Sequence, residues 1–380
     1  MSKGIHRRLS GDSRFALNAI CPYFTMFPLE YPLRTLDPGR LRSYRTPVVC
    51  DPYCGRGTTV FAARLRGLPV YGIDIAPVAV AIARAKLAYT TTEEVMSLLA
   101  ELLEDTPRVE IPTGQFWDWA FGPDTLEALC RIREGLLNRR SPAAFLLRAV
   151  MLGALHGPRA KSLPAASYFS NQMPRTFAAK PDYAVRYWKR QRRKPPRVDL
   201  SAIIKKRTTR VLSTPLRCAR TLPADVQCAD SRSAAAFKRL HGKITHVVTS
   251  PPYYGLRTYS QDQWLREWFL GGPTTVNYRK GPGLDHSSPE SFARSLAEVW
   301  DNIGYHASSR IRLYIRFGAI GSRKAVADDI LRDSLKLSTH PWRVLTRHTA
   351  SSANVGKRQA VQMQAAPDPI EESDYVVILS

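Results

Sequence analysis

The four residues Ser250, Pro251, Pro252 and Tyr253 have types and spacing that could do chemistry at the end of a strand. They follow the apolar run 244–249, which is typical of a buried strand. Two consecutive prolines end a strand and supply no backbone donor, so carbonyl oxygens beyond the strand remain unpaired. Unpaired acceptors beside an aromatic ring suit a planar group that carries an NH2, such as a nucleobase amine. A proline-rich turn without chemical function also fits these four residues when they are taken alone.

A second group of candidate residues also follows an apolar run, 46–50, and begins with an acid. The turn reads Asp51-Pro52-Tyr53-Cys54-Gly55-Arg56-Gly57-Thr58-Thr59. We expect a helix at 60–67 and a second strand at 69–73 that ends in Asp74. Glycines in such a turn let the backbone approach a nucleotide-like ligand, and an acid after the second strand can bind both ribose hydroxyls. The pattern therefore predicts a site for a ribose-containing ligand.

Two ligand classes compete for this turn. A dinucleotide fingerprint requires a third small residue three positions after Gly57, where Val60 stands, and an acid directly before the turn is unusual for it. Asp51 suits a ligand with a cationic amino-acid end, because a carboxylate at a strand end can hold an ammonium group. S-adenosylmethionine has both a ribose and such an end, so the residues favour it.

The two motifs together resemble the amino-methyltransferases of DNA, which methylate the exocyclic amine of cytosine or adenine. The cofactor motif of that family is similar to 51–59, and its catalytic motif, an Asp, Asn or Ser followed by two prolines and an aromatic, is similar to 250–253. The segment 22–28 resembles the N-terminal cofactor motif, and 226–232 resembles the strand and acid that contact the adenine amine. The resemblance covers about 15–90, 225–320 and the last strand, 375–379.

This resemblance implies the cofactor S-adenosylmethionine and assigns residues to two sets. The implied cofactor-binding residues are Tyr23, Phe24, Asp51, Pro52, Tyr53, Gly55, Gly57, Thr58, Thr59, Asp74, Ile75, Asp230 and Ser231. The implied catalytic residues are Ser250, Pro251, Pro252 and Tyr253.

The target base follows from the Ser form of the catalytic motif, which resembles the cytosine-N4 enzymes more than the adenine-N6 enzymes. The amine would donate to the Ser250 side chain and the Pro251 carbonyl, Tyr253 would stack on the base, and transfer would be direct. In duplex DNA the base must first be flipped out. Cytosine-C5 chemistry needs a nucleophilic Cys after a proline, and the sequence has no such pair. We expect no metal, because the six Cys lack paired zinc spacing.

The implied fold is α/β, a Rossmann-like methyltransferase fold with a mixed, mostly parallel sheet flanked by helices and a largely helical inserted lobe. We expect a cofactor half at 1–90, an inserted helical and basic lobe for target recognition at 91–224, and a catalytic half at 225–380. The alternative role of the insertion is a helical cap over the cofactor and the flipped base. The apolar segment 145–155 predicts a buried helix, and 312–318 and 375–379 predict late strands around a polar hairpin or loop at 351–369.

Charge indicates a polyanionic partner. The 380-residue chain has a net charge of +24 and a pI near 10.1. The stretch 186–210 has eleven basic residues against one acid, Asp199. Phosphate contacts from such a run would position a duplex and make binding sensitive to salt. The predicted nucleic-acid-binding residues are Arg175, Arg186, Lys189, Arg190, Arg192, Arg193, Lys194 and Arg257, and Asn171 and Gln172 are candidate base readers.

The sequence indicates a prokaryotic cytoplasmic, nucleoid-associated protein, because six Cys occur without an apolar signal region or a membrane span. Duplex DNA is the expected partner, together with a cognate restriction endonuclease or another defence partner. Two alternatives stay open. One is an RNA base methyltransferase, because the basic run suits both polymers, and the other is a non-catalytic DNA-binding subunit that keeps the fold.

Overall fold

The computed structural model of the chain describes residues 13–23, 28–105, 108–157, 167–173, 180–214, 222–240, 242–255, 260–278, 283–319, 326–350 and 371–380. Of the predicted site residues, Phe24, Arg175 and Arg257 lie outside the described residues, as does the predicted hairpin or loop at 351–369.

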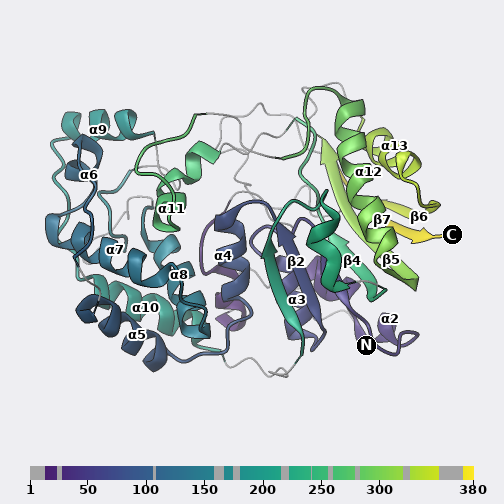
Figure 1. Cartoon of the computed structure of the whole chain (residues 1–380), viewed down its shortest axis with the longest axis horizontal. Coiled ribbons are helices and arrows are strands. Elements are labelled where there is room, and N and C mark those ends of the chain that lie inside the picture. Colours follow the sequence, from purple (N-terminus) through teal and green to yellow (C-terminus); the bar gives the residue numbers. More distant parts are fainter. Residues whose placement is uncertain are drawn as a thin grey trace.

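A seven-stranded sheet forms the centre of the fold (Figure 1). Its strands are β1 (Val49–Asp51), β2 (Val70–Asp74), β3 (Ala224–Cys228), β4 (Ile244–Thr249), β5 (Ala307–Ala319), β6 (Trp342–Thr349) and β7 (Glu371–Leu379), in the order β3-β2-β1-β4-β5-β7-β6. The strands β1 to β5 are parallel, and β7 lies antiparallel between β5 and β6. The chain therefore builds outward from β1 to β3 and then returns to place β4 on the other side of β1. In open α/β sheets, ligands bind beyond the carboxyl ends of the strands at such a reversal.

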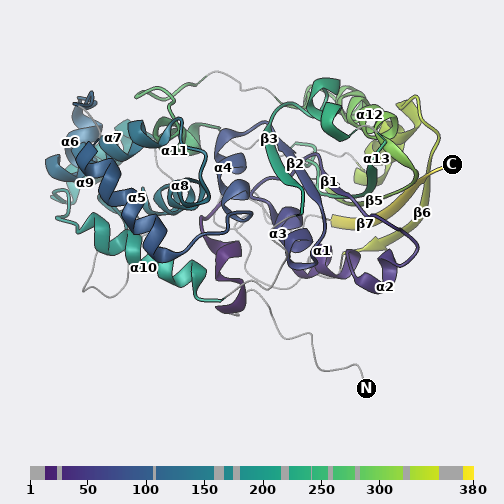
Figure 2. The same cartoon turned by 60° about the horizontal axis from the view of Figure 1, so that its bottom comes forward.

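Side chains that alternate along the strands belong to two separate hydrophobic cores, one on each face of the sheet. Val49 and Val248 belong to one core, whereas their neighbours Cys50 and Val247 belong to the other. The first core includes residues of α1 (Glu30–Thr35), α3 (Thr58–Leu65) and α4 (Pro77–Ala85), and the second includes η3 (Ala234–Leu240), α12 (Pro289–Tyr305) and α13 (Ala327–Leu337). Figure 2 shows α12 and α13 on the opposite side of the strands from α1 and α3. Because both faces are covered, the central strands β1 and β4 are buried along their whole length.

A lobe of helices, called here the helical lobe, spans 92–212 in the described residues and lies beside the sheet (Figure 1). Its helices are α5 (Thr92–Asp105), α6 (Gln115–Ala120), α7 (Pro123–Leu136), α8 (Pro142–Ala154), α9 (Pro181–Arg190) and α10 (Leu200–Leu212). The lobe packs on the sheet domain through α4 and α8, and one apolar core runs through both parts. At Gly153 of α8, a Cβ would lie 2.7 Å from the Ile20 carbonyl oxygen, so a glycine allows the N-terminal segment 13–23 to approach α8 closely.

The predicted fold class is confirmed: the sheet is mixed and mostly parallel, helices flank it, and the inserted lobe is largely helical. The buried helix at 145–155 corresponds to α8, and the two predicted late strands lie within β5 and β7. Strand β6 was not predicted, because its exposed residues give only a weak alternation. Among the described residues there is no helix with the length and apolar character that crossing a membrane requires.

Candidate active site

The two sequence motifs meet at the carboxyl ends of β1 and β4, where the strand order reverses. Asp51 is the last residue of β1, and Ser250 directly follows β4. The hydroxyl of Thr249 donates to Asp51 Oδ1 over 2.7 Å, although the two residues are 198 positions apart. The Thr59 hydroxyl donates to the Val248 carbonyl at 2.9 Å, which holds the start of α3 against β4. The predicted cofactor turn and the predicted catalytic motif are therefore direct neighbours.

Asp51 is a buried carboxylate that accepts hydrogen bonds from two neighbouring residues. It is only 1 % exposed, and it accepts hydrogen bonds from the Thr249 hydroxyl and, at 3.2 Å, from the Tyr53 backbone N–H. Burial outweighs these donors and raises the pKa of Asp51 from 3.8 to about 7. Among the described residues no cationic side chain forms an ion pair with it. A ligand ammonium at this position would offset the cost of ionising it.

The two glycines of the turn have different tasks. Gly57 has φ +78°, and a Cβ there would lie 2.7 Å from Ala83 Cβ, so this glycine allows the start of α3 to approach α4. Gly55 has φ +49°, and nothing lies within 4 Å of where its Cβ would be. The open side of Gly55 leaves the backbone accessible to a ligand, as the sequence predicts for this turn.

Asp74, the last residue of β2, is oriented by the backbone of the neighbouring loops. Its Oδ2 accepts from the Gly55 N–H at 2.8 Å and its Oδ1 from the Ala76 N–H at 2.9 Å. Burial raises the pKa of Asp74 despite these donors. The Ile75 backbone is a third donor, and because a carboxylate has about four acceptor sites, Asp74 keeps capacity for a hydroxyl donor such as one of a ribose. Ile75, also predicted to bind the cofactor, directly follows Asp74, and its backbone lowers the pKa of that acid.

Asp230 and Ser231 lie beyond β3 and have partners within the protein. Asp230 forms an ion pair with Arg232, at 2.6 Å between Oδ2 and Nη2, and this pairing lowers the pKa of the carboxyl. The buried hydroxyl of Ser231 donates to the Pro52 carbonyl, so it fixes the cofactor turn. Asn302 of α12 in turn donates to the Ser231 and Arg232 carbonyls at 3.0 and 2.9 Å. Sequence reasoning missed this contribution of α12, for which the local sequence gives no signal.

The N-terminal segment reaches the same site. Burial and the nearby Asp74 both raise the pKa of Tyr23, whereas Arg266 lowers it, so Tyr23 lies within electrostatic reach of both. Arg266 of α11 (Trp264–Phe269) is buried and donates to the Pro22 carbonyl at 2.8 Å and to the Leu152 carbonyl at 3.1 Å. This single guanidinium joins the N-terminal segment, the helical lobe and the region after the catalytic motif.

The catalytic motif places Tyr253 in a polar and aromatic environment. Pro251 is buried, Pro252 is exposed, and the Tyr253 ring contacts Phe317 edge-on with centroids 6.0 Å apart. Burial and the nearby Glu372 of β7 raise the pKa of the Tyr253 phenol, whereas the Ser250 side chain lowers it, so both residues lie close to Tyr253. Sequence reasoning missed Glu372, because β7 lies more than a hundred residues downstream in the chain.

The basic run continues from α9 into the following loop. Its exposed cations at 186–194 are Arg186, Lys189, Arg190, Arg192 and Lys194, whereas Arg193 is half-buried. Lys189 donates to Gln115 of α6 at 3.0 Å.

Two neighbours of this run that the sequence offered as base readers have structural tasks instead. Asn171 is 2 % exposed and donates to the Trp119 and Arg193 carbonyls, at 3.1 and 2.7 Å. Gln172 is also buried, and its carbonyl accepts from the Trp188 indole at 3.3 Å. The interpretation of Asn171 as a base reader is therefore wrong, because its side-chain amide is buried and already bonds two carbonyls, whereas the role of the Gln172 side chain stays a prediction.

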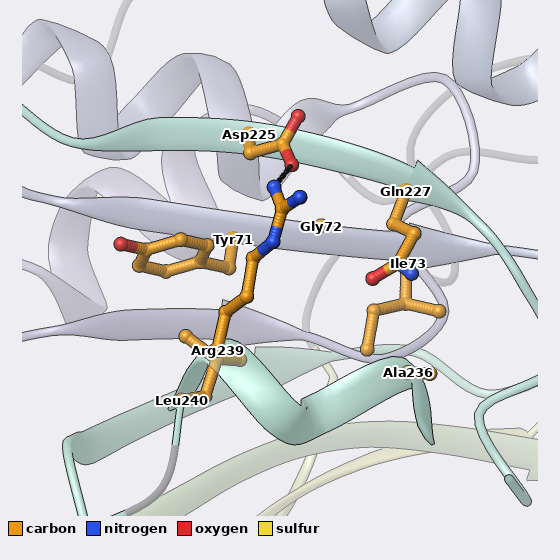
Figure 3. A pocket seen from close by; sticks show the side chains of 8 residues that line it. All are labelled: Tyr71, Gly72, Ile73, Asp225, Gln227, Ala236, Arg239 and Leu240. Atoms are coloured by element: carbon orange, nitrogen blue, oxygen red, sulfur yellow. Dashed lines mark hydrogen bonds and ion pairs between the residues drawn. The ribbon is translucent and has the colours of Figure 1, made fainter. Parts of the chain in front are cut away.

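A separate small hollow lies between the sheet and η3 (Figure 3). It is lined by Tyr71, Gly72, Ile73, Asp225, Gln227, Ala236, Arg239 and Leu240. Its polar feature is the Asp225–Arg239 pair at 3.4 Å, and it contains neither catalytic-motif residues nor Asp51 or Asp74. We therefore assign the candidate active site to the carboxyl ends of β1, β2 and β4 rather than to this hollow. In the described part of the chain, no group of His, Cys, Asp and Glu side chains is arranged to hold a metal ion.

Comparisons with known proteins find similarity only among solved structures, and the TM-scores are low. No protein-family model matches this sequence, and no curated protein matches it. Among solved structures, the rRNA methyltransferase aviRa from Streptomyces viridochromogenes, determined at 1.5 Å, is similar with a TM-score of 0.36 and 15% identity, over 99% of this chain and 94% of that one. A second structure of aviRa, at 2.4 Å, has a TM-score of 0.35 and 14% identity, over 98% and 93%. These scores are too low for an argument about function, which therefore rests on the site itself.

The residues present fit S-adenosylmethionine, the cofactor that the family resemblance implies. Asp51 suits the ammonium group, because it is a buried carboxylate that forms no ion pair with the described side chains. An oriented acid at the end of β2 suits the ribose, and the open side of Gly55 suits close approach of the ligand to the backbone.

Proposed function

We propose that this protein is an S-adenosylmethionine-dependent methyltransferase that acts on an exocyclic nucleobase amine, and that its target is the N4 amine of cytosine in duplex DNA. The observation that carries the proposal is the hydrogen bond between Thr249 and Asp51, which brings an acid suited to the cofactor within one residue of Ser250. Methyl transfer requires this proximity, because its rate depends on holding donor and acceptor in line.

The chain contributes binding, orientation and acceptor groups. S-adenosylmethionine, when bound, supplies an electrophilic methyl group on its sulfonium. Asp51 would hold the ammonium end, and Asp74 would accept from the ribose hydroxyls. Ser250 and the Pro251 carbonyl would accept from the target amine and favour a lone pair that points at the methyl group. Acceptors at this position also stabilise the positive charge that develops on the nitrogen.

The helical lobe is proposed to hold the nucleic acid. Its exposed cations would contact phosphates, which would give affinity and register without specifying sequence. A duplex substrate must present its target base outside the stack, so base flipping is part of the proposal. The Ser at position 250 supports cytosine over adenine through the family resemblance alone. Adenine N6 in DNA and a base in RNA remain the alternatives, and a restriction-modification or defence context remains the proposed setting, with a cognate endonuclease as partner.

The test is to incubate the protein with labelled S-adenosylmethionine and either duplex DNA or RNA of mixed sequence, and then identify the methylated nucleoside after digestion. N4-methylcytosine supports the proposal in full. N6-methyladenine keeps the enzyme class and rejects the base assignment, and label confined to RNA moves the target to RNA. No transfer to any nucleic acid rejects the proposed function.

Variants of the two motifs separate binding from transfer. Asp51→Ala should abolish cofactor binding, because it removes the only acid of the turn. Ser250→Ala and Tyr253→Ala should lose transfer while keeping cofactor affinity, as measured by calorimetry. Full activity of Tyr253→Ala would contradict the proposed base pocket.

A further inference from the structure

Two exposed tyrosines flank one exposed lysine where the helical lobe meets the segment that follows α11. Tyr183 is 45 % exposed and Tyr278 is 56 % exposed. Lys180 Nζ lies 5.5 Å from the centre of the Tyr278 ring, which brings the start of α9 and the segment after α11 together (Figure 1). Lys180 is the N-cap of α9 and Tyr183 follows three positions later, so both lie on the same side of the first turn. Of the three exposed tyrosines in the described part of the chain, two therefore lie beside the same cation.

Tyr278 is held by the part of the chain that follows the catalytic motif. Gln261 of η4 (Ser260–Gln263) donates from its side-chain Nε2 to the Tyr278 carbonyl at 3.4 Å. The chain continues from η4 directly into α11, where the buried Arg266 donates to the Leu152 carbonyl of the helical lobe. The two tyrosines thus come from both sides of the junction between the lobe and the catalytic half.

The exposed face of α9 extends this cluster with cations. Tyr183, Arg186 and Arg190 follow one another at spacings of three and four residues, so they line one face of the helix, whereas Trp188 is buried on the other. Within the described residues no acid forms an ion pair with Lys180, Arg186 or Arg190. Exposed rings beside unpaired cations suit a nucleic-acid strand, because bases stack on the rings while phosphates pair with the cations.

We propose that Tyr183 and Tyr278, called here the stacking surface, bind unpaired bases of DNA, and that Lys180 and the cations of α9 contact the phosphates beside them. This inference rests on the proposed function and adds to it the form of the substrate, a DNA strand in which bases near the target have left the stack. Base flipping breaks the stacking around the target, and aromatic side chains replace part of it. Bases inside a duplex are covered by their neighbours, so the stacking surface selects unpaired over paired DNA.

The experiment measures the affinity of the full chain for four labelled probes by fluorescence anisotropy. The probes are a DNA strand of about 10 nucleotides, an abasic strand of the same length, the RNA strand of the same sequence and the paired DNA duplex. The abasic strand keeps the sugars and phosphates and lacks only the bases, so it separates stacking from charge. The wild type should bind the base-containing DNA strand about 10- to 100-fold more tightly than the abasic strand.

Variants assign this difference to particular side chains. Tyr183→Ala and Tyr278→Ala should each bind the base-containing DNA strand about 10-fold more weakly and leave the affinity for the abasic strand unchanged. Tyr278→Phe keeps the ring and should bind like the wild type. Lys180→Ala should weaken the binding of both strands alike and reduce the slope of log affinity against log salt by about 0.7.

Tyr305→Ala is the matched control for loss of an exposed tyrosine. Tyr305 is 66 % exposed, and it ends α12 just before the amino end of β5, so it lies at the edge of the sheet opposite the catalytic motif. This variant should bind every probe like the wild type. The melting temperatures of all the tyrosine variants should match that of the wild type, because the replaced side chains are exposed.

The outcomes separate the stacking surface from the proposed function. Wild-type affinity of Tyr183→Ala and Tyr278→Ala for the base-containing strand, or an equal loss for the base-containing and abasic strands, would overturn the stacking surface and leave the proposed function intact. Loss of affinity in these variants for the RNA strand alone would overturn the assignment to DNA. Base-dependent binding by a wild type that methylates no nucleic acid would instead overturn the proposed function and leave the stacking surface as a site for DNA binding.

Discussion

Replacement of Asp51 by asparagine should change how the stability of the cofactor-free protein depends on pH. The folded protein raises the pKa of Asp51 from 3.8 to about 7, so it prefers the protonated form more than the unfolded chain does. A raised pKa in the folded state contributes stability that is fully present below the unfolded value and is lost as pH rises through the folded value. Wild-type stability should therefore fall between about pH 4 and pH 7 on account of this one group.

The magnitude follows from the same shift. One pKa unit is about 1.4 kcal/mol, so ionising Asp51 costs the folded protein on the order of 4 kcal/mol. The part of this cost that develops between pH 5 and pH 8 is about 2 to 3 kcal/mol. An asparagine side chain has nearly the same shape as the aspartate, can still accept from the Thr249 hydroxyl and does not ionise. The stability of Asp51→Asn relative to wild type should therefore increase by about 2 to 3 kcal/mol over this pH range.

The assay is urea unfolding of both proteins at several pH values without cofactor, followed by cofactor binding under the same conditions. Only the pH dependence of the difference matters, because groups that do not interact with Asp51 titrate equally in the two proteins and cancel. For wild type, affinity for S-adenosylmethionine should rise with pH up to about 7, since the ammonium needs the ionised carboxylate. Asp51→Asn should bind weakly at every pH.

A difference in stability that does not change between pH 5 and pH 8 would refute the reasoning. It would mean that Asp51 is ionised in the folded protein well below pH 7, and that its ionisation carries no cost for a ligand cation to offset. Tight cofactor binding by Asp51→Asn would refute the assigned ligand contact, even if the stability result held.

Three further predictions concern the turn, β3 and the lobe. Gly57→Ala should lower the free energy of unfolding in urea melts by about 3 kcal/mol, because the new Cβ would clash with α4 and the residue has a positive φ. Gly55→Ala should lower it by only about 1 kcal/mol and should mainly weaken cofactor affinity, because nothing lies near its Cβ position. Asp230→Asn should weaken cofactor binding in calorimetry less than Asp51→Asn does, because Arg232 already occupies that carboxylate; an equal loss would contradict this. The double variant Arg190→Ala, Arg192→Ala should reduce the slope of log affinity against log salt for DNA by about 2, and an unchanged slope would place the duplex elsewhere.

The positions of the motif residues could be predicted from the sequence, because each follows an apolar strand. Parallel strands expose their carboxyl ends at one edge, so Asp51, Asp74 and Ser250 had to lie near one another once 49–51, 70–74 and 244–249 were recognised as strands. The need for a glycine in the turn could also be predicted, since only a residue without a side chain fits at position 57. These features depend on local pattern and on a general rule of sheet topology.

The side chains that organise the site could not be predicted in the same way. Arg266 of α11 and Asn302 of α12 each donate to a backbone carbonyl in a distant segment, and Glu372 of β7 lies close to Tyr253. Their own surroundings in the sequence are those of ordinary helix or strand residues. Asn171 illustrates the reverse error, because a polar side chain in a basic region was interpreted as a base reader and is in fact a buried link between two segments.

The acids at the ends of β1, β2 and β3 show why residue type alone does not define a role. All three are aspartates at the same edge of one sheet, yet their electrostatic environments differ. Asp230 is satisfied by Arg232, and the pKa of its carboxyl is lowered. Asp74 is oriented by backbone donors, whereas Asp51 forms no ion pair with the described side chains, and burial raises its pKa to about 7. A ligand with an ammonium group gains most at Asp51, because there it relieves a cost that the folded protein already bears. For the proposed cofactor, this difference would place the ammonium end at Asp51 and the ribose at Asp74.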